Sequence, residues 1–194
     1  MRRRINFRSV CLLAGICLVL AAVALPFWWQ AGVQASREEM EKTLDMIRSR
    51  IPEPRSAAIE ERRDNTMSVL SLDGVDFVGI LEIPRYGAAL PVCADWGEIT
   101  RHPCRLSGSI YDGTMQIGGT SQAAQFDFYR ELSYGDTVYF TDMEGSRYGY
   151  TVTDIRYESH ADQTALQRKE AALTLFVKNV FGFEYIVIFC NPMG

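Results

Sequence analysis

Histidine is the scarcest reactive residue type in this chain, and its scarcity limits the chemistry that the chain can support. Only His102 and His160 occur among 194 residues, so a histidine-rich metal site is excluded. The 5 cysteines include no C-x-x-C pair, so metal-ligand spacing is absent too. A basic excess is also missing: 20 Lys and Arg residues stand against 24 Asp and Glu, a net charge of −4. The composition therefore indicates no metal, no cofactor and no nucleic-acid partner.

Charged residues are absent from residues 10–29, and this absence predicts a transmembrane anchor. As a helix, the stretch would span about 30 Å, the thickness of the hydrocarbon core of a bilayer. Residues 1–9 are rich in arginine, which favours a cytoplasmic N-terminus and an outward-facing remainder of the chain. Trp28 and Trp29 at the far end suit the outer membrane interface. The pattern predicts a single-pass cell-membrane protein with its C-terminal part outside the cytoplasm.

Two other interpretations of this segment stay open. Val33-Gln34-Ala35 would pass as a small-residue cleavage site, and the segment would then be a signal peptide that is removed. The third interpretation is a helix buried in a soluble protein. The anchor and the signal peptide both place the rest of the chain outside the cytoplasm.

Residues 30–74 are expected to form a helical and charged stalk. Ser36-Arg37-Glu38-Glu39 has the pattern of a capping box and predicts the start of a helix. Prolines at positions 52 and 54 predict its end. The apolar stripe of this helix is expected to lie against the domain or the lipid headgroups, and pairing with another helix is the alternative. The stripe consists of Met40, Leu44, Ile47 and Ile51.

Residues 75–194 are expected to form one β-rich domain. Short apolar or alternating runs bounded by Gly, Pro and Asp are typical of strands. A short helix is predicted over residues 121–132, where Phe126, Tyr129 and Leu132 share a face. Many short strands with Gly-rich turns favour a mostly antiparallel barrel or sandwich. The predicted strands cover residues 75–83, 88–92, 114–118, 137–142, 148–157, 172–177 and 184–189.

Several phrases of the sequence, taken in order, resemble those of the sortases, bacterial transpeptidases that join surface proteins to the cell envelope. The resemblance covers about residues 75–190, and the anchor also matches, since most of these enzymes are tethered by an N-terminal helix. The phrases are GILEIP at 79–84, LPV at 90–92, GS at 108–109, MQIGG at 115–119, QF at 125–126, GD at 135–136 and LTLF at 173–176.

The resemblance implies a mainly β fold, a closed sortase-like barrel of about eight strands with one or two short helices. It also implies a chemistry in which a cysteine attacks a threonyl carbonyl, a histidine transfers protons and an arginine steadies the oxyanion. The implied partners are a sorting-signal peptide, a surface protein or an active sortase. The implied location is the outer face of a cell membrane, in a Gram-positive bacterium.

All three positions that carry this chemistry hold other residues here. The histidine position, after a strand that ends in Gly-Gly, is Thr120, and the cysteine position is Lys178. The nearest match to the arginine is Tyr185, with Glu184 beside it. A lysine ammonium is no nucleophile and a threonine hydroxyl is no base at neutral pH. We therefore expect a catalytically inactive homologue that binds a peptide or an envelope-assembly partner.

An active sortase-like transpeptidase or hydrolase with an altered site is the alternative. Thr120 and Lys178 would face one another across the cleft, and a desolvated lysine can activate a hydroxyl. A surface lysine beside a turn threonine is the favoured interpretation. Cys190 is expected at a strand end or in the core. His102-Pro103-Cys104 brings a histidine and a cysteine close in sequence, but such neighbours seldom meet side chain to side chain.

Other residues leave further questions. Phe181 and Phe183, together with Glu184, are the candidates for lining a peptide groove, and His160 is expected in a solvated loop. A disulfide between Cys93 and Cys104 would suit an oxidising compartment, but the sequence does not demand one. Whether the stalk dimerises also stays open.

Overall fold

The computed structural model describes residues 7–57, 65–159, 170–180, 182 and 184–193. The chain divides into two compact units, Met1–Glu38 and Glu39–Gly194. The helix α1 (Phe7–Arg48) starts in the first unit and ends in the second. Among the described residues, α1 is the one helix that is long and apolar enough to cross a membrane.

The predicted helix start at Ser36 is wrong, because α1 continues through this position. The Ser36 hydroxyl donates a hydrogen bond of 3.0 Å to the carbonyl oxygen of Gly32, one turn earlier. A serine inside a helix satisfies its hydroxyl in this way, whereas a capping serine accepts from an N–H group that follows it. The helix ends at Arg48, ahead of the two prolines that predicted its end.

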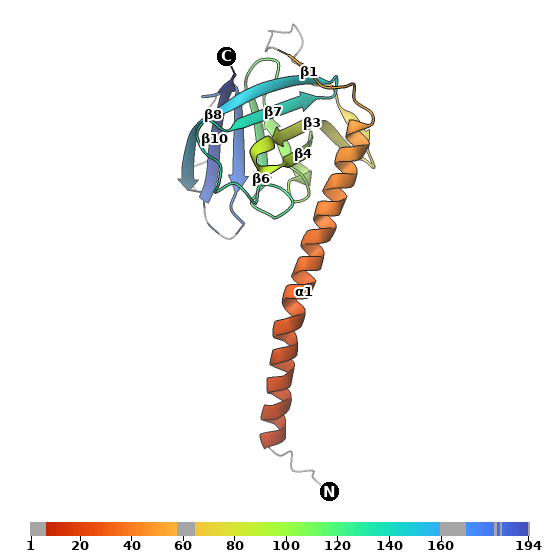
Figure 1. Ribbon diagram of the computed structural model, residues 1–194, viewed down its shortest axis with the longest axis vertical. Helices are drawn as coiled ribbons and strands as arrows, with labels where there is room; N and C mark the ends of the chain where they lie inside the picture. The colour runs from red at the N-terminus through yellow and green to blue at the C-terminus, as the bar shows by residue number, and fades with distance from the viewer. Residues whose placement is uncertain (1–6, 58–64, 160–169, 181, 183, 194) are drawn as a thin grey trace. The chain divides into compact units, whose positions relative to one another are not determined.

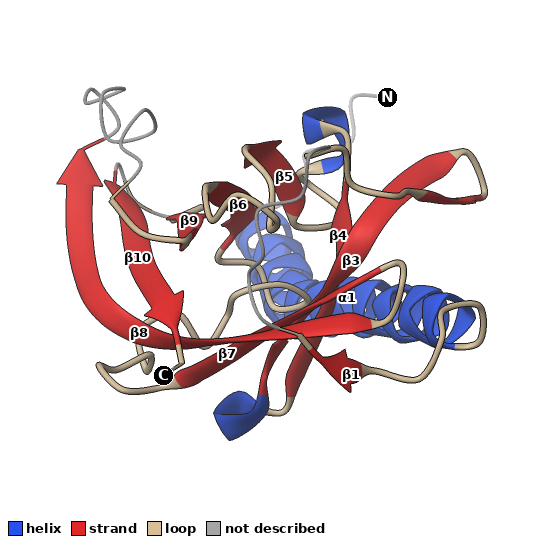
Figure 2. Ribbon diagram, turned by 90° about the horizontal axis from the view of Figure 1, so that it is seen from above, coloured by secondary structure: helices blue, strands red, loops and turns tan. Residues whose placement is uncertain are grey.

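The second unit is built on a closed circuit of strands (Figures 1 and 2). The circuit runs β3-β4-β5-β6-β9-β10-β8-β7, and β7 pairs back onto β3. Its strands are β3 (Val75–Ile83), β4 (Ala88–Cys93), β5 (Cys104–Ser107), β6 (Met115–Thr120), β7 (Thr137–Asp142), β8 (Ser146–Ser159), β9 (Leu173–Lys178) and β10 (Glu184–Pro192). This closed eight-stranded barrel confirms the predicted fold class.

Four smaller elements complete the unit. The short strand β1 (Arg55–Ser56) runs parallel to β8, and β2 (Leu70–Leu72) runs antiparallel to β3. The 3-10 helices η1 (Pro84–Tyr86) and η2 (Trp96–Glu98) lie on either side of β4 in the chain. The described part of the chain thus bears out the expectation of one or two short helices, at positions that were not predicted.

Side chains fill the barrel and also cover part of its outer face. The interior cluster includes Ile117, Phe140 and Leu175. A second cluster lies on the outer face, where Leu44 and Ile47 of α1 pack against strands β2 to β5. The apolar stripe of the predicted stalk helix therefore lies against the domain, as expected. The compact unit begins at Glu39, and this packing ties the last turns of α1 to the sheet.

The segment 121–132 forms a series of turns and not the predicted helix. Its backbone hydrogen bonds join residues three apart, as from the N–H of Tyr129 to the carbonyl of Phe126 at 3.1 Å. The expected apolar face exists nonetheless, since Phe126, Tyr129 and Leu132 are buried. Burial of side chains at a spacing of three is compatible with successive turns as well as with a helix, so the pattern alone did not distinguish them.

Candidate functional site

The ends of three neighbouring strands bring together the residues that stand at the expected catalytic positions. In the parallel register of β6 and β9, Thr120 lies beside Lys178. In the antiparallel register of β9 and β10, Lys178 lies beside Tyr185. Figure 2 shows the three strands side by side in the wall of the barrel. These positions are distant in sequence and adjacent in the sheet.

The three side chains belong to the outer face of the barrel. Along β9, Leu173, Leu175 and Val177 belong to the interior cluster. Because side chains alternate along a strand, Lys178 is on the opposite face. Thr120 and Tyr185 share that face, since residues in register on adjacent strands point to the same side of a sheet. Lys178 is exposed, whereas Thr120 is only 5% exposed.

Thr120 is held by its backbone and not by its hydroxyl. Its N–H donates a hydrogen bond of 2.9 Å to Oε1 of Gln125. Nε2 of the same Gln125 donates to the carbonyl oxygen of Ile99 at 3.1 Å. The buried Oγ1 of Thr120 has no hydrogen-bond partner among the described residues. A buried hydroxyl without a partner carries a free-energy cost that a bound polar group would remove.

A tryptophan ring covers the strand just before Thr120. A Cβ atom at Gly118 would lie 2.4 Å from the ring of Trp96, so the ring rests directly on the backbone of β6. Only glycine permits so close an approach. Trp96 remains 45% exposed, and it therefore presents an aromatic surface beside the buried threonine.

The turn after Lys178 is bonded to the turn after Thr120. The N–H of Ser121 donates to the carbonyl oxygen of Lys178 at 2.9 Å, and the Ser121 hydroxyl accepts from the N–H of Val180 at 3.1 Å. Glu184 opens β10 and is exposed. The other two candidates for lining a groove, Phe181 and Phe183, lie outside the described residues.

Of the described cysteines, Cys190 lies away from these strand ends, whereas Cys104 of β5 is in register with Gly118, two residues before Thr120. Cys190 is in register with Leu173, at the opposite end of β9 from Lys178, and is buried in the barrel interior. Burial raises the pKa of its thiol to about 12, so it is protonated near neutral pH and is an inert core cysteine. Cys190 was expected either at a strand end or in the core, and the structure places it in the core.

Cys104 and His102 do not form a dyad through their side chains. The Cys104 thiol donates to the backbone carbonyl oxygen of His102, at 3.3 Å. The His102 ring packs edge-on against Phe77, with the ring centroids 5.3 Å apart. His160 lies outside the described residues. Among the described residues, no group of three or more His, Cys, Asp or Glu side chains is placed to hold a metal ion.

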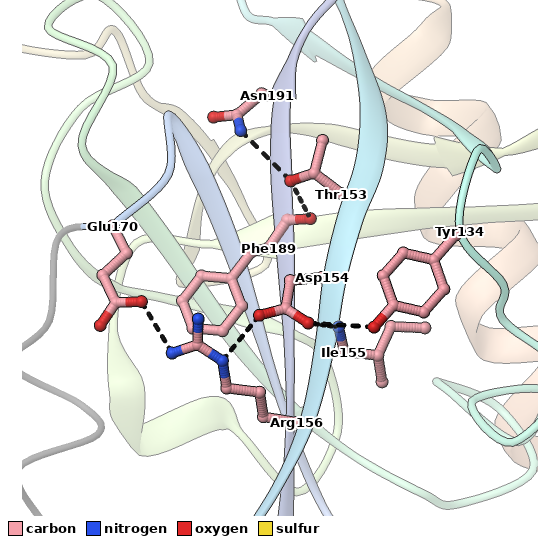
Figure 3. Close-up of polar contacts among 8 residues, drawn as sticks. All are labelled: Tyr134, Thr153, Asp154, Ile155, Arg156, Glu170, Phe189 and Asn191. Atoms are coloured by element: carbon pink, nitrogen blue, oxygen red, sulfur yellow. Dashed lines mark hydrogen bonds and ion pairs between the residues drawn. The ribbon is translucent and has the colours of Figure 1, made fainter.

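A second polar cluster lies on the outer face of β8 and β10 (Figure 3). The guanidinium of Arg156 bridges two carboxylates, Asp154 and Glu170, each at 2.7 Å. It also lies over the ring of Phe189, 4.6 Å from the centroid. The hydroxyl of Tyr134 donates to Asp154 at 3.1 Å. The guanidinium of Arg156 is already paired with both carboxylates. It is therefore not available to take the place of the arginine that the resemblance to sortases led us to expect.

Structural comparison relates this barrel to sortases. A mutant in the lid of sortase A from Corynebacterium diphtheriae aligns with a TM-score of 0.53 and 21% identity, over 62% of this chain and 72% of that one. Sortase C from Clostridium perfringens SM101 aligns with a TM-score of 0.50 and 17% identity, over 61% and 71%. Sortase C from Clostridium perfringens with the C-terminal cell wall sorting motif aligns with a TM-score of 0.52 and 18% identity, over 61% and 71%.

These similarities define a sortase-like fold. No protein-family model and no curated protein sequence matches the chain. At identities of 17–21% the likeness concerns the fold alone. The chemistry of this chain therefore has to be argued from its own residues.

Sequence reasoning found the three strand-end positions but missed their surroundings. Trp96 and Gln125 contact the same short stretch of β6, although they come from segments on opposite sides of it in the chain. The only sequence signal for the first contact was the Gly-Gly pair at the end of β6. Arg156 gave no signal, because its partner Glu170 follows a separate segment of the chain.

Proposed function

We propose that this chain is a membrane-tethered binding protein of sortase-like fold, which holds a sorting-signal-like peptide or an envelope-assembly partner without cleaving it. The carrying observation is the character of Thr120, Lys178 and Tyr185 at three adjacent strand ends. None of these residues supplies a thiolate, an imidazole or a guanidinium. Removal of a nucleophile or its base typically lowers the rate by several orders of magnitude.

Binding draws support from the groups that remain. The buried hydroxyl of Thr120 has no partner among the described residues, and a peptide carbonyl that reached it would satisfy this donor. The half-exposed ring of Trp96 offers an apolar and aromatic surface next to it. Lys178 is exposed beside them and can meet an acidic or carboxylate group. An aromatic surface with a few convergent polar groups is typical of ligand sites.

The tether belongs to the same proposal. One helix of the described chain is apolar and long enough to cross a membrane, and the arginines before it favour an outward-facing barrel. A barrel outside the cytoplasm would meet secreted surface proteins as they leave the cell. It would also be placed beside an active sortase of the same membrane, which is the other partner that we propose.

The competing function is an enzyme with an altered Thr120–Lys178 site. The in-register contact of the two residues favours it. Exposure of Lys178 speaks against it, because a lysine becomes a general base when burial removes its solvation. The binding proposal is therefore the stronger of the two.

A peptide assay separates the two functions. The full chain in detergent micelles is titrated against a fluorescent peptide that carries a cell wall sorting motif, and anisotropy measures binding while mass spectrometry measures cleavage. We expect saturable binding with no cleavage product and no acyl adduct. Trp96→Ala should weaken binding by about tenfold, since one aromatic contact contributes on the order of 1 kcal/mol. Trp28→Ala, in the anchor, is the matched control.

Two results would contradict the proposal. Cleavage that is abolished by Lys178→Ala or Thr120→Ala would establish the altered enzyme. Equal affinity for the motif peptide and a scrambled peptide, with and without Trp96, would exclude a motif-binding site at these strand ends.

A further inference from the structure

The contact between β4 and β5 is the narrowest in the barrel circuit. It consists of one register pair, Cys93 with Cys104. By contrast, β3 and β4 have six register pairs, and so do β6 and β9. One backbone hydrogen bond, from the N–H of Cys93 to the carbonyl oxygen of Pro103 at 2.8 Å, flanks the junction. Closure of the barrel here depends on very few interactions.

The two cysteines at this junction lie side by side on neighbouring strands. Both are fully buried, and both belong to the outer-face cluster with Leu44, Ile47 and Phe77. Interaction with the Cys104 thiol is the main cause that raises the pKa of the Cys93 thiol. Residues in register on adjacent strands point to the same side and lie about 5 Å apart, within the separation of about 4.4–6.8 Å that a disulfide spans. Both sulfurs occur as free thiols in this structure.

We infer that Cys93 and Cys104 are a disulfide-forming pair that locks the β4–β5 junction and holds the connecting loop, residues 94–103, against β6. The geometry carries the inference: two buried cysteines on neighbouring strands form the one register pair of their junction. The outward placement of the barrel that we propose would supply oxidising conditions. The inference does not rest on peptide binding.

The bond forms by exchange with an external disulfide oxidant, such as an oxidised dithiol protein or oxidised glutathione. A thiolate of one cysteine attacks the external disulfide and releases one thiol. The other cysteine then attacks this mixed disulfide, forms the Cys93–Cys104 bond and releases the second thiol. The pair loses two electrons and two protons, and the external disulfide gains them.

Exchange has to occur before the junction is covered. In the folded chain, interaction with Cys104 is the larger cause and burial the second cause that raise the pKa of the Cys93 thiol. A buried and protonated thiol reacts slowly, because the thiolate is the nucleophile. The bond therefore forms during folding, while β4 and β5 are still open to solvent. Once formed, the same burial shields it from reduction.

The Cys93–Cys104 bond would restrain the loop 94–103, which lies beside the candidate site. Within the loop, Trp96 rests on Gly118 of β6, and the carbonyl oxygen of Ile99 is bonded to Gln125. Oε1 of Gln125 in turn accepts a hydrogen bond from the N–H of Thr120. A covalent link between the two ends of the loop limits how far these contacts can open, so it orders the surroundings of Thr120.

Peptide mapping tests the bond directly. The full chain is denatured, reduced and refolded in detergent with a mixture of reduced and oxidised glutathione, and free thiols are then alkylated. Trypsin cuts after Arg85, Arg101 and Arg105, so the bond would join peptide 86–101 to peptide 102–105. We expect this joined species, lighter by two hydrogens than its parts, in most of the refolded protein. Alkylation of both cysteines in most refolded molecules would overturn the inference.

Thermal unfolding provides a second test. A closed loop of this length should raise Tm by about 5–10 °C over the reduced protein. Cys93→Ala should abolish the difference between oxidised and reduced samples. Cys17→Ser, an exposed cysteine of the first unit, should leave the difference intact. Equal Tm for wild-type protein refolded with oxidised glutathione and wild-type protein refolded with reductant would contradict the inference, whatever the peptide assay finds.

Discussion

Single residues decide what the strand ends of this barrel can do. Lys178, Thr120 and Tyr185 occupy neighbouring register positions, yet their side chains differ in exposure and in chemistry. A solvated ammonium, a buried hydroxyl and a phenol can bind polar groups, but they cannot reproduce a thiolate paired with an imidazole. The sortase-like fold therefore leaves the function open, and the residues at the strand ends favour binding.

His102 is a buried residue whose ionisation should affect stability near neutral pH. It is 3% exposed, its Nδ1 has no partner among the described residues, and it faces the charged groups Arg101, Glu39 and Glu98. Burial is the larger cause and repulsion from Arg101 the second cause that lower its pKa below the ordinary value of 6.5. The folded state therefore keeps the ring neutral at pH values where the unfolded chain takes up a proton.

This difference predicts a pH-dependent stability. The free energy of unfolding should be constant above about pH 6.5 and should fall as the pH drops from there towards the folded pKa of His102. Urea unfolding between about pH 5 and 8 measures the slope. His102→Gln should flatten the slope, whereas His160→Gln, the only other histidine, should retain it. An unchanged slope in His102→Gln would assign the effect to other groups.

At the scale of elements, the last turns of α1 act as part of the barrel. Met40, Leu44 and Ile47 are buried, and the last two pack with Phe77 and Ile80 of β3. Ion pairs reinforce this contact: Arg48 meets Glu82 of β3 at 3.1 Å, and Arg101 pairs with Glu39. Since these pairs are partly exposed, the apolar contact supplies most of the stability.

Truncation of this contact should be costly. Ile47 is fully buried, so Ile47→Ala should lower the free energy of unfolding of the second unit by about 2–5 kcal/mol. Met46, the next residue, is 37% exposed, and Met46→Ala should cost less than about 0.5 kcal/mol. Chemical denaturation of the full chain in detergent compares the two. Equal loss in both variants would mean that the helix end contributes nothing specific.

At the scale of the whole molecule, an apolar helical unit and a β-barrel share one chain. The first unit is suited to a bilayer, and its described tryptophans, Trp28 and Trp29, are exposed, at 85% and 67%. Large apolar side chains that the protein itself leaves exposed are usually covered by another surface, such as a partner protein or a membrane. Lipid is the cover that the length and composition of this helix favour.

The proposed orientation can be tested on cells. Trypsin added to intact protoplasts should remove the barrel, because outward-facing sites such as Arg85 and Arg101 are accessible, with side-chain exposures of 58% and 54%. A tag fused to the N-terminus should stay protected until the membrane is permeabilised. Protection of the barrel in intact protoplasts, with digestion only after lysis, would reverse the orientation.

Much of the fold followed from local patterns. The strands β3 and β7 were predicted with the bounds that the structure shows, because apolar alternation and the turns beside them act over a few residues. β1, β2 and β5 were missed, since each is short and is defined by its partner strand. The segment 121–132 was misassigned for a related reason: its buried spacing fits turns as well as a helix.

The chain's local chemistry determined its apolar helix, most of its strands and the identity of the residues at the expected catalytic positions. Only the tertiary structure decided which of these residues are neighbours. Periodicity assigns a side chain to a face of a strand, but strand order and register depend on contacts between distant segments. The meetings of Thr120 with Lys178, of Trp96 with Gly118 and of Cys93 with Cys104 are of this second kind.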